Sequence, residues 1–256
     1  MKVEKIHFEE QLSQVIWDDS AAALAIELRD KEKQVMKLIY LELRSGKQYV
    51  IEEGLSWWYQ LQACSQGKLL LNGFEDPGLP MTKGIFAFDA RSSQKLWTRP
   101  SSHFLHPSTN GIWIEQEGEK VFIKLEDGLS TNPPSTKDHK KYEKALASDY
   151  QPCRVVYRLD EDFPQLQKKI ETLWGHKADE YLDHLILEGK EIFSYPHKNP
   201  RAGWDQEIGI LKDGEILLAQ KTGKQLKGIA WSTFFVWRKQ LIWQEGYRSI
   251  CFSDLG

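Results

Sequence analysis

The sequence predicts a mainly β fold, built as an array of about five small antiparallel sheets of four strands each. Short apolar runs follow one another along most of the chain, separated by turn residues such as those at 45–46 and 110–111. The run Leu38–Lys47 aligns without a gap with Ile85–Gln94, 47 positions later. A period of roughly 40 to 50 residues is typical of one four-stranded unit. The ten tryptophans and the aromatic content of 12% also favour strands.

The segment Gly84–Trp97 shows how one repeat is built. We expect a strand to end at Asp89, whose carboxylate can accept hydrogen bonds from backbone N–H groups of the following turn. Trp97 lies on the next strand and offers a large surface for packing between neighbouring sheets. Together with Ala87 and Ser92-Ser93, these residues form a pattern that resembles the repeat of quinoprotein-like β-propellers, in which Thr-Gly replaces the two serines.

Ser93 departs from that repeat, because a residue other than glycine is strained at positive φ. We therefore expect a different type of turn there. In the earlier copy, Glu42 replaces the aspartate, Gly46 restores the glycine and Val50 occupies the tryptophan position. Residues 121–128 form a third and weaker copy.

The expected strands group into five sheets of a propeller-like array. Several strands, among them Leu38–Leu43 and Leu69–Leu71, are continuously apolar, as a strand covered on both faces would be. The sheets comprise residues 12–52, 57–98, 102–125 with 153–159, 180–221, and 231–252 with 3–9. The strands are expected at 3–9, 12–17, 21–29, 34–43, 47–52, 57–63, 68–74, 83–90, 94–98, 102–107, 111–117, 120–125, 180–187, 190–195, 206–212, 215–221, 231–237, 240–245 and 248–252.

Two inserts interrupt the sheets. Residues 129–152 are polar and proline-bearing, and we expect a solvated loop or a short helix there. The second insert, 160–179, carries the clearest helix signal near 160–175. Asp162 can cap this helix, Pro164 lies in its first turn and Gly175 follows its end. The apolar face of the helix comprises Phe163, Leu166, Ile170 and Leu173.

The N-terminal strand at 3–9 is expected to complete the last sheet, which would close the ring of sheets and remove an exposed edge. The whole chain, 1–256, then forms a single propeller-like domain. The alternative is an incomplete array of three sheets followed by an α+β domain from about residue 153, since the repeat fades where the helix begins.

Composition limits the classes of function. The formal net charge of −3, from 37 acidic and 34 basic residues, gives no overall attraction to nucleic acid or to anionic membranes. No stretch approaches the roughly 20 apolar residues of a membrane span, and the N-terminus lacks the features of a signal peptide. Cys64, Cys153 and Cys251 are widely spaced and are expected to be reduced core residues. These features predict a cytoplasmic protein.

Loops on one face of the array are the expected place for a ligand. Because antiparallel strands alternate in direction, the connections at 75–82, 160–179 and 196–205 would emerge together, and rigid loops on a β scaffold often carry binding groups. Against this, Glu75-Asp76 before Pro-Gly also suits an ordinary turn, and Arg201 can pair with a nearby carboxylate. The ligand-binding candidates are Glu75, Asp76, His197, Arg201 and Trp204.

Sequence signatures of catalysis are not found. The chain has no nucleophile elbow, P-loop, Rossmann glycine set or Cys-x-x-Cys pair, so we expect no catalytic residue, no cofactor and no metal. His103 and His106, three apart in an extended run, should point to opposite faces. His176, Asp183 and His184 beside the helix can form a metal or acid–base group, although solvated polar residues are the expected interpretation.

Residues 74–90 resemble the central signature of a family of uncharacterised bacterial proteins of the Bacteroidetes type, related to quinoprotein-like propellers. The resemblance implies a propeller-like protein with no catalytic residues to carry over. Two functions remain open. The expected one is a non-enzymatic binding or scaffold module for an unknown protein or small-molecule ligand. The alternative is a carbohydrate-active enzyme that hydrolyses glycosidic bonds with two carboxylates.

Overall fold

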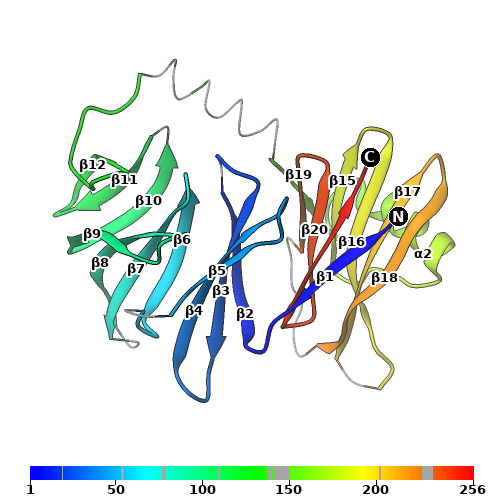
Figure 1. Cartoon of the computed structure of the whole chain (residues 1–256). Helices are drawn as coiled ribbons and strands as arrows, with labels where there is room; N and C mark the ends of the chain where they lie inside the picture. Colours follow the sequence, from blue (N-terminus) through cyan, green and yellow to red (C-terminus); the bar gives the residue numbers. More distant parts are fainter. Residues whose placement is uncertain are drawn as a thin grey trace. The chain divides into compact units, whose positions relative to one another are not determined.

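The structure, a computed structural model, describes residues 1–18, 20–52, 55–76, 79–108, 110–135, 137, 140, 150–201, 203–226 and 233–256. For residues 76, 79–81, 225 and 226 only the backbone is described. The chain divides into two compact units: unit 1 comprises Met1–Glu9 and Ala147–Gly256, and unit 2 comprises Glu10–Leu146. The regular structure is mostly antiparallel β, which confirms the predicted fold class (Figure 1). Among the described helices, none has the length and apolar character needed to cross a bilayer.

The described residues of unit 2 form three antiparallel sheets in which strands consecutive in sequence are neighbours (Figure 1). The first sheet contains β2 (Gln11–Trp17), β3 (Ala23–Asp30), β4 (Val35–Glu42) and β5 (Gln48–Ile51). The second contains β6 (Tyr59–Ser65), β7 (Lys68–Asp76), β8 (Leu79–Asp89) and β9 (Lys95–Pro100). The third contains β10 (Ser102–Ser108), β11 (Gly111–Gln116) and β12 (Glu119–Lys124).

The inner strands of unit 2 are buried on both faces. On β7, Leu71 belongs to a core cluster shared with Tyr40 of the first sheet. The preceding residue, Leu70, belongs to a cluster shared with Ile114 of the third sheet. Because successive side chains of a strand point to opposite faces, an uninterrupted apolar run is what such a strand requires. The expectation of doubly covered strands is therefore confirmed.

One backbone turn recurs at the end of the third strand in each sheet of unit 2. The N–H group four residues after the turn begins donates a hydrogen bond back to the first carbonyl, and the donor residue has a positive φ. The pairs are Gly46 to Glu42 (2.8 Å, φ 68°), Ser93 to Asp89 (3.0 Å, φ 61°) and Gly128 to Lys124 (3.1 Å, φ 68°). The three sequence copies therefore share one local structure.

Asp89 and Trp97 behave as the repeat pattern predicts. The Asp89 carboxylate accepts hydrogen bonds from the backbone N–H groups two and three residues on, at 3.1 and 2.7 Å. The indole N–H of Trp97 donates to the carbonyl of Leu125 at 2.9 Å, which ties the second sheet to the third. The expectation of another turn type at Ser93 was wrong, because the hydrogen-bonded turn fixes its φ at 61° and the serine bears the strain.

Unit 1 contains two five-stranded antiparallel sheets. One has the order β14 (Arg154–Tyr157), β15 (Tyr181–Leu187), β16 (Lys190–Lys198), β17 (Trp204–Lys212) and β18 (Glu215–Leu226). The other has the order β1 (Val3–His7), β21 (Ser249–Asp254), β20 (Gln240–Glu245), β19 (Phe234–Trp237) and β13 (Tyr150–Pro152). The pairing of β1 with β21 confirms that the N-terminal strand completes the last sheet (Figure 1). Each sheet formed by the described residues is open and has two edge strands.

Two strand assignments in this unit differ from the prediction. Residues 153–159 were expected in the third sheet, but β14 pairs with β15, with Val156 opposite Leu182, and the third sheet keeps three strands. Val156 is fully buried in the core beneath the helix, and this non-local packing has no signature in the local pattern. The end of the polar insert 129–152 forms β13, which pairs with β19.

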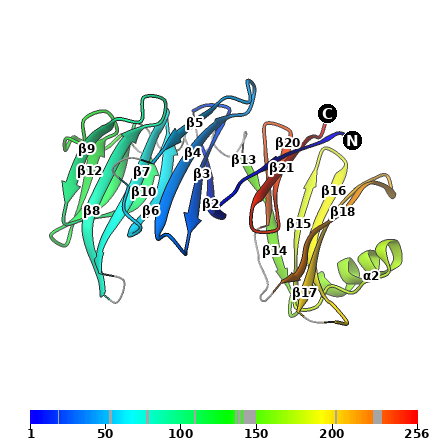
Figure 2. The same cartoon turned by 60° about the horizontal axis from the view of Figure 1, so that its bottom comes forward.

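The predicted helix is α2 (Phe163–Trp174), and it lies beside the β14–β18 sheet (Figure 2). It ends at Gly175, which adopts a φ of 75° and donates its N–H to the carbonyl of Glu171 at 2.9 Å. Asp162 occupies the N-cap position but makes no capping hydrogen bond, because its carboxylate pairs with Arg154. The buried residues of the helix are Phe163, Leu166 and Ile170, which pack in one cluster with the sheet.

Candidate functional site

One face of the β14–β18 sheet carries a row of polar side chains. Tyr195 and His197 lie two residues apart on β16, as do Asp205 and Glu207 on β17, so each pair shares one face of its strand. The register places Tyr195 opposite Glu207 and His197 opposite Asp205. On the next strand, Lys221 lies opposite Glu207. Five polar side chains from three strands are thus neighbours.

The helix α2 adds His176 to this row. The Trp174 ring, on the last helical residue, packs near the ring of Tyr195, with centroids 6.3 Å apart. It also covers Gly209, where an added Cβ atom would lie only 2.3 Å from the indole. Glycine is therefore required for this close approach. Gly175 then ends the helix, and His176 follows it directly.

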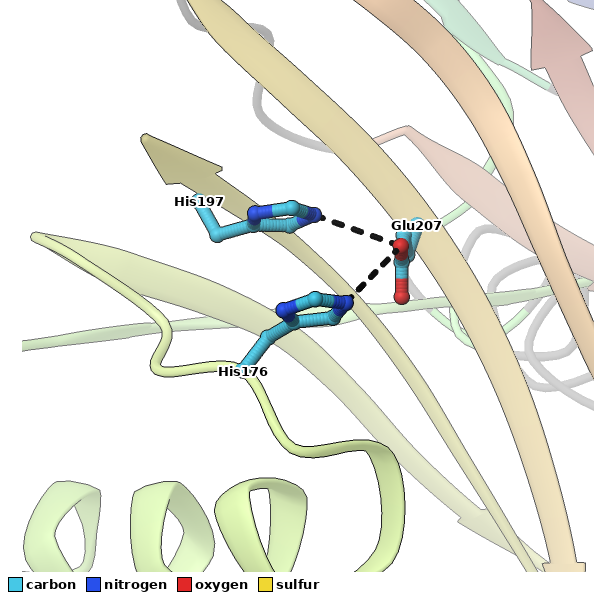
Figure 3. A group of neighbouring side chains, drawn as sticks. All are labelled: His176, His197 and Glu207. Carbon is cyan, nitrogen blue, oxygen red and sulfur yellow. Dashed lines mark hydrogen bonds and ion pairs between the residues drawn. The ribbon is translucent and has the colours of Figure 1, made fainter. Parts of the chain in front are cut away.

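His176, His197 and Glu207 point toward one another (Figure 3). Nε2 of His197 lies 3.2 Å from Oε1 of Glu207, and Nε2 of His176 lies 3.6 Å from the same oxygen. The two imidazole rings are stacked, with centroids 4.2 Å apart and planes 5° from parallel. The ligand atoms of all three residues lie within 4.8 Å of one another. In the described part of the chain, no other group of three His, Cys, Asp or Glu side chains gathers in this way.

The three side chains differ in exposure. The side chain of His176 is 44% exposed, whereas those of His197 and Glu207 are 9% and 14% exposed. The two residues of the sheet therefore form the buried part of the site, and His176, from the segment after α2, lies on its solvent side. A small solute can reach the shared point from that side.

Oε2 of Glu207 and the carboxylate of Asp205 accept hydrogen bonds from neighbouring side chains. The Tyr195 hydroxyl donates to Oε2 of Glu207 at 3.0 Å. Burial, and then the charge of Glu207, raise the pKa of Tyr195 well above its usual range, so the hydroxyl remains a donor at neutral pH. Nζ of Lys221 lies 2.7 Å from Oδ2 of Asp205 and 4.0 Å from Oε1 of Glu207. Asn199 donates to Oδ1 of Asp205 at 2.8 Å.

Two imidazole nitrogens and one carboxylate oxygen are the ligands that zinc and similar divalent ions prefer. With metal–ligand bonds of about 2.0–2.2 Å, the ligand atoms of a tetrahedral site lie roughly 3.3 Å apart. The distances of 3.2 and 3.6 Å from the two histidines to Oε1 of Glu207 are of this size. The residue types and these separations are therefore compatible with a divalent ion.

Of the five ligand candidates predicted from the sequence, His197 lies in this site. Trp204 precedes Asp205 on β17 and faces the other way, with its ring centroid 5.8 Å from Nζ of Lys198. Arg201 is exposed in the turn between β16 and β17, where its N–H donates to the side chain of Asn199 at 2.8 Å. For Trp204 and Arg201 a role in binding stays a prediction.

Glu75 and Asp76 belong to unit 2 and lie on β7. Glu75 is exposed, and the side chain of Asp76 is outside the described part of the chain. The segment 75–82 was expected to be a long loop, which was wrong. Pairing of β7 with β8 continues beyond a bulge to Asp76 opposite Leu79, so the described residues of the segment, 75–76 and 79–82, belong to these two strands. Their binding role remains a prediction.

Glu207 was not among the candidates predicted from the sequence, and the proximity of His176 to His197 was not predicted either. The available signal was the pair of acids two residues apart in the strand-like run 204–212, because acidic residues rarely face a core without a partner. The suggested trio of His176, Asp183 and His184 does not assemble. Asp183 accepts hydrogen bonds from Thr233, and His184 pairs with Glu191.

A hollow in unit 2 is less suited to a ligand. Its volume is about 290 Å³, and its polar lining includes Glu10, Lys37 and Glu52. Lys37 bridges the two glutamates at 2.7 and 2.9 Å. Its charged groups are therefore already paired with one another, whereas in unit 1 two histidines face one carboxylate oxygen.

Comparison with known proteins gives a family match over part of the chain. Residues 17–97 match the family described as "Domain of unknown function (DUF4905)". This match covers about a third of the chain and lies within unit 2, so it does not include the histidine–glutamate cluster. No curated protein matches the sequence.

Solved structures similar to the chain include β-propeller proteins. The β-propeller domain of the Trilobed protease from Pyrococcus furiosus is 12% identical, with a TM-score of 0.33, and the match covers 92% of this chain and 64% of that one. The acylaminoacyl peptidase of Pyrococcus horikoshii, in its orthorhombic crystal form, is 10% identical, with a TM-score of 0.30, over 93% of this chain and 36% of that one. The chain thus spans less than two thirds of either structure, and similarity at this level says nothing about activity.

Proposed function

We propose that the chain is a non-enzymatic binding module that holds one divalent transition-metal ion, of which zinc is the best match, between His176, His197 and Glu207. The observation that carries the proposal is the convergence of two imidazole nitrogens on one oxygen of a largely buried glutamate. The proposal departs from the expectation, drawn from the sequence, that the chain holds no metal.

The surroundings of Glu207 support this role. A metal-binding carboxylate is usually oriented by a hydrogen bond to its other oxygen, and the Tyr195 hydroxyl makes such a bond at 3.0 Å. The three ligands come from three separate segments: His176 from the segment after α2, His197 from β16 and Glu207 from β17. An ion would therefore link the end of the helix to the sheet.

Glycoside hydrolysis has less support. That reaction needs two carboxyl groups facing a sugar, one acting as acid and the other as base or nucleophile. The neighbouring carboxylates of the site, Asp205 and Glu207, are both engaged. Asp205 accepts from Lys221 and Asn199, and Glu207 accepts from Tyr195 and faces the histidines.

The test is zinc binding by the full-length chain after treatment with a chelator. We expect isothermal titration calorimetry and metal analysis to show one ion per chain. Glu207→Gln and His197→Gln should each weaken binding by at least about 100-fold, because loss of an outer-shell partner alone typically costs 10–100-fold.

His184→Gln is the matched control. His184 lies in the same sheet and pairs with a glutamate, Glu191, at the same Nε2–Oε1 distance of 3.2 Å, but no third His, Cys, Asp or Glu of the described residues joins them. Its loss should leave zinc binding unchanged. Absence of a stoichiometric ion in the wild type, or equal loss in the control, would contradict the proposal.

We also propose four properties that the sequence suggests. They are a quinoprotein-like repeat, a bacterial source of the Bacteroidetes type, a single domain over 1–256 and a cytoplasmic location. The shared turn of the three copies in unit 2 favours a true repeat. The buried thiols of Cys64, Cys153 and Cys251 suit a reducing compartment.

A further inference from the structure

We propose that the metal ion of this site binds a small oxyanion, a carboxylate or a phosphate, as its fourth ligand, and that Lys221 provides the second contact to that anion. This inference rests on the proposed metal binding and names the class of ligand that the same site takes. It concerns the open side of the cluster, where His176 is exposed.

The first argument is coordination number. Zinc in proteins is almost always bound by four ligands, and sites with three protein ligands leave the fourth position to water or to another molecule. Within the described residues the group of ligand atoms contains His176, His197 and Glu207 and no fourth His, Cys, Asp or Glu. The side chain of His176 is 44% exposed, so the remaining position is accessible from solvent.

The second argument is charge. Asp205 and Lys221 form a close pair at 2.7 Å and neutralise each other. The only other charged side chain of the polar row is Glu207, since histidines that bind a metal are neutral. A divalent ion therefore leaves the occupied site with a net positive charge, which favours an anion over a neutral ligand.

The third argument is the position of Lys221. Its ammonium group lies 4.0 Å from Oε1 of Glu207, the oxygen that faces both histidines, and its side chain is 35% exposed. A carboxylate or phosphate carries at least two oxygens, so one can bind the ion while another accepts a hydrogen bond from this ammonium group. Asp205 shows that a carboxylate can contact the same nitrogen.

The test uses Co²⁺ in place of zinc, because its visible absorption reports the ligands around the ion. The Co²⁺-loaded full-length chain is titrated with sodium acetate and, separately, with sodium phosphate at constant ionic strength. We expect a saturable change of the Co²⁺ spectrum with at least one of them, and the responding arm tells a carboxylate from a phosphate ligand. In Lys221→Met the affinity for that anion should fall by about tenfold while Co²⁺ still binds.

Lys198→Met is the matched control, because Lys198 lies in the same sheet, at the end of β16, but its ammonium group lies 5.8 Å from the ring centroid of Trp204. It should leave the anion affinity unchanged. A Co²⁺ spectrum that stays constant with both anions would overturn the inference and leave metal binding intact. Equal anion affinity in Lys221→Met and wild type would overturn the role of the lysine. Failure of Co²⁺ and zinc to bind at all would overturn the proposed function as well.

Discussion

Two buried carboxylates, Asp18 of unit 2 and Glu207 of unit 1, show how differently the two units use the same chemical group. Asp18 is fully buried. Its oxygens accept hydrogen bonds from the backbone N–H groups of Ser20, Gln66 and Gly67 at 2.9, 3.1 and 2.7 Å. The hydroxyls of Ser20 and Tyr40 and the thiol of Cys64 add to this set.

Glu207 is surrounded instead by side chains that can release a proton or bind an ion. Among the described residues its partners are the side chains of Tyr195, His197, His176 and Lys221, and none of these contacts comes from a backbone N–H. A backbone N–H group neither titrates nor binds a metal ion. We therefore interpret a carboxylate held by such groups as structural. A carboxylate faced by two imidazoles is available for another purpose. Burial alone therefore does not identify a functional acid; the chemistry of its partners does.

The largest effect should come from removal of Asp18. Asp18→Ala leaves buried donors on the first and second sheets without an acceptor, and each unsatisfied group costs about 1–3 kcal/mol. We expect the free energy of unfolding to fall by at least about 3 kcal/mol in denaturant titrations followed by circular dichroism. The zinc-free Glu207→Gln chain should lose at most about 1 kcal/mol. Similar losses in the two variants would remove the distinction between the two carboxylates.

Zinc should stabilise the chain only when Glu207 is intact, and independently of Asp18. A ligand that binds only the folded state at 100 times its dissociation constant adds about 2.7 kcal/mol of stability. We expect thermal unfolding of the wild type to shift upward with zinc, and the shift to disappear in Glu207→Gln. Asp18→Asn should keep the shift, whatever its own melting temperature. A zinc-dependent shift retained by Glu207→Gln would place the ion elsewhere.

Gly209→Ala should weaken the site without changing any ligand. The added methyl group would lie 2.3 Å from the Trp174 indole, which must move and take the end of α2 with it. Overpacking of this kind costs about 1–3 kcal/mol. We expect several-fold weaker zinc binding in calorimetry and an altered tryptophan fluorescence. The control is Gly189→Ala, since a Cβ there meets no atom within 4 Å. The φ of 75° at Gly189 strains an alanine, so this variant should lose some stability but keep the zinc affinity of the wild type.

Acid should remove part of the contribution of Asp18. Burial by itself raises the pKa of Asp18, but hydrogen bonds from Ser20, Gly67 and Tyr40 outweigh it, so that the pKa lies below its usual value. A lowered pKa in the folded state stabilises the fold above the unfolded pKa of about 3.9. That contribution is lost as the pH falls through the lower, folded pKa.

The effect is smaller than that of Asp18→Ala because a protonated carboxyl still presents acceptor oxygens. Denaturant titrations between pH 7 and 2 should show a wild-type stability that falls more steeply at low pH than that of Asp18→Asn, whose amide does not titrate in this range. Parallel pH profiles would show that Asp18 does not sense acid in the way proposed.

The smallest effect concerns the repeated turn of unit 2. Ser93 adopts a φ of 61°, where Gly46 at the equivalent place adopts 68° without a side chain. Ser93→Gly should raise the free energy of unfolding by about 0.5 kcal/mol, after loss of the hydroxyl bond to Val50. Gly46→Ser should lower it by about 1 kcal/mol. Opposite signs in denaturant titrations are required; equal signs would refute strain as the cause.

Much of the fold could be predicted because most strands, turns and the helix have a pattern of apolar and turn residues within a short segment of sequence. The apolar run at 69–71, the turn after Asp89 and the helix that ends at Gly175 each follow from neighbouring residues. The assignment of β14 could not be predicted in this way. It depends on burial of Val156 in one cluster with α2 and with Phe193 and Leu211 of the sheet, and these two sheet residues lie far from β14 in sequence.

The candidate site shows the same division. The sequence by itself determined the parts: a strand over 206–212 that carries Glu207, a strand over 190–195 that ends just before His197, and a helix followed by His176. Only the tertiary structure decided that these parts meet, because the register of β16 with β17 and the packing of Trp174 on Gly209 bring the three side chains together. Short-range patterns set backbone conformation, whereas the convergence of ligand atoms depends on which distant faces bury each other.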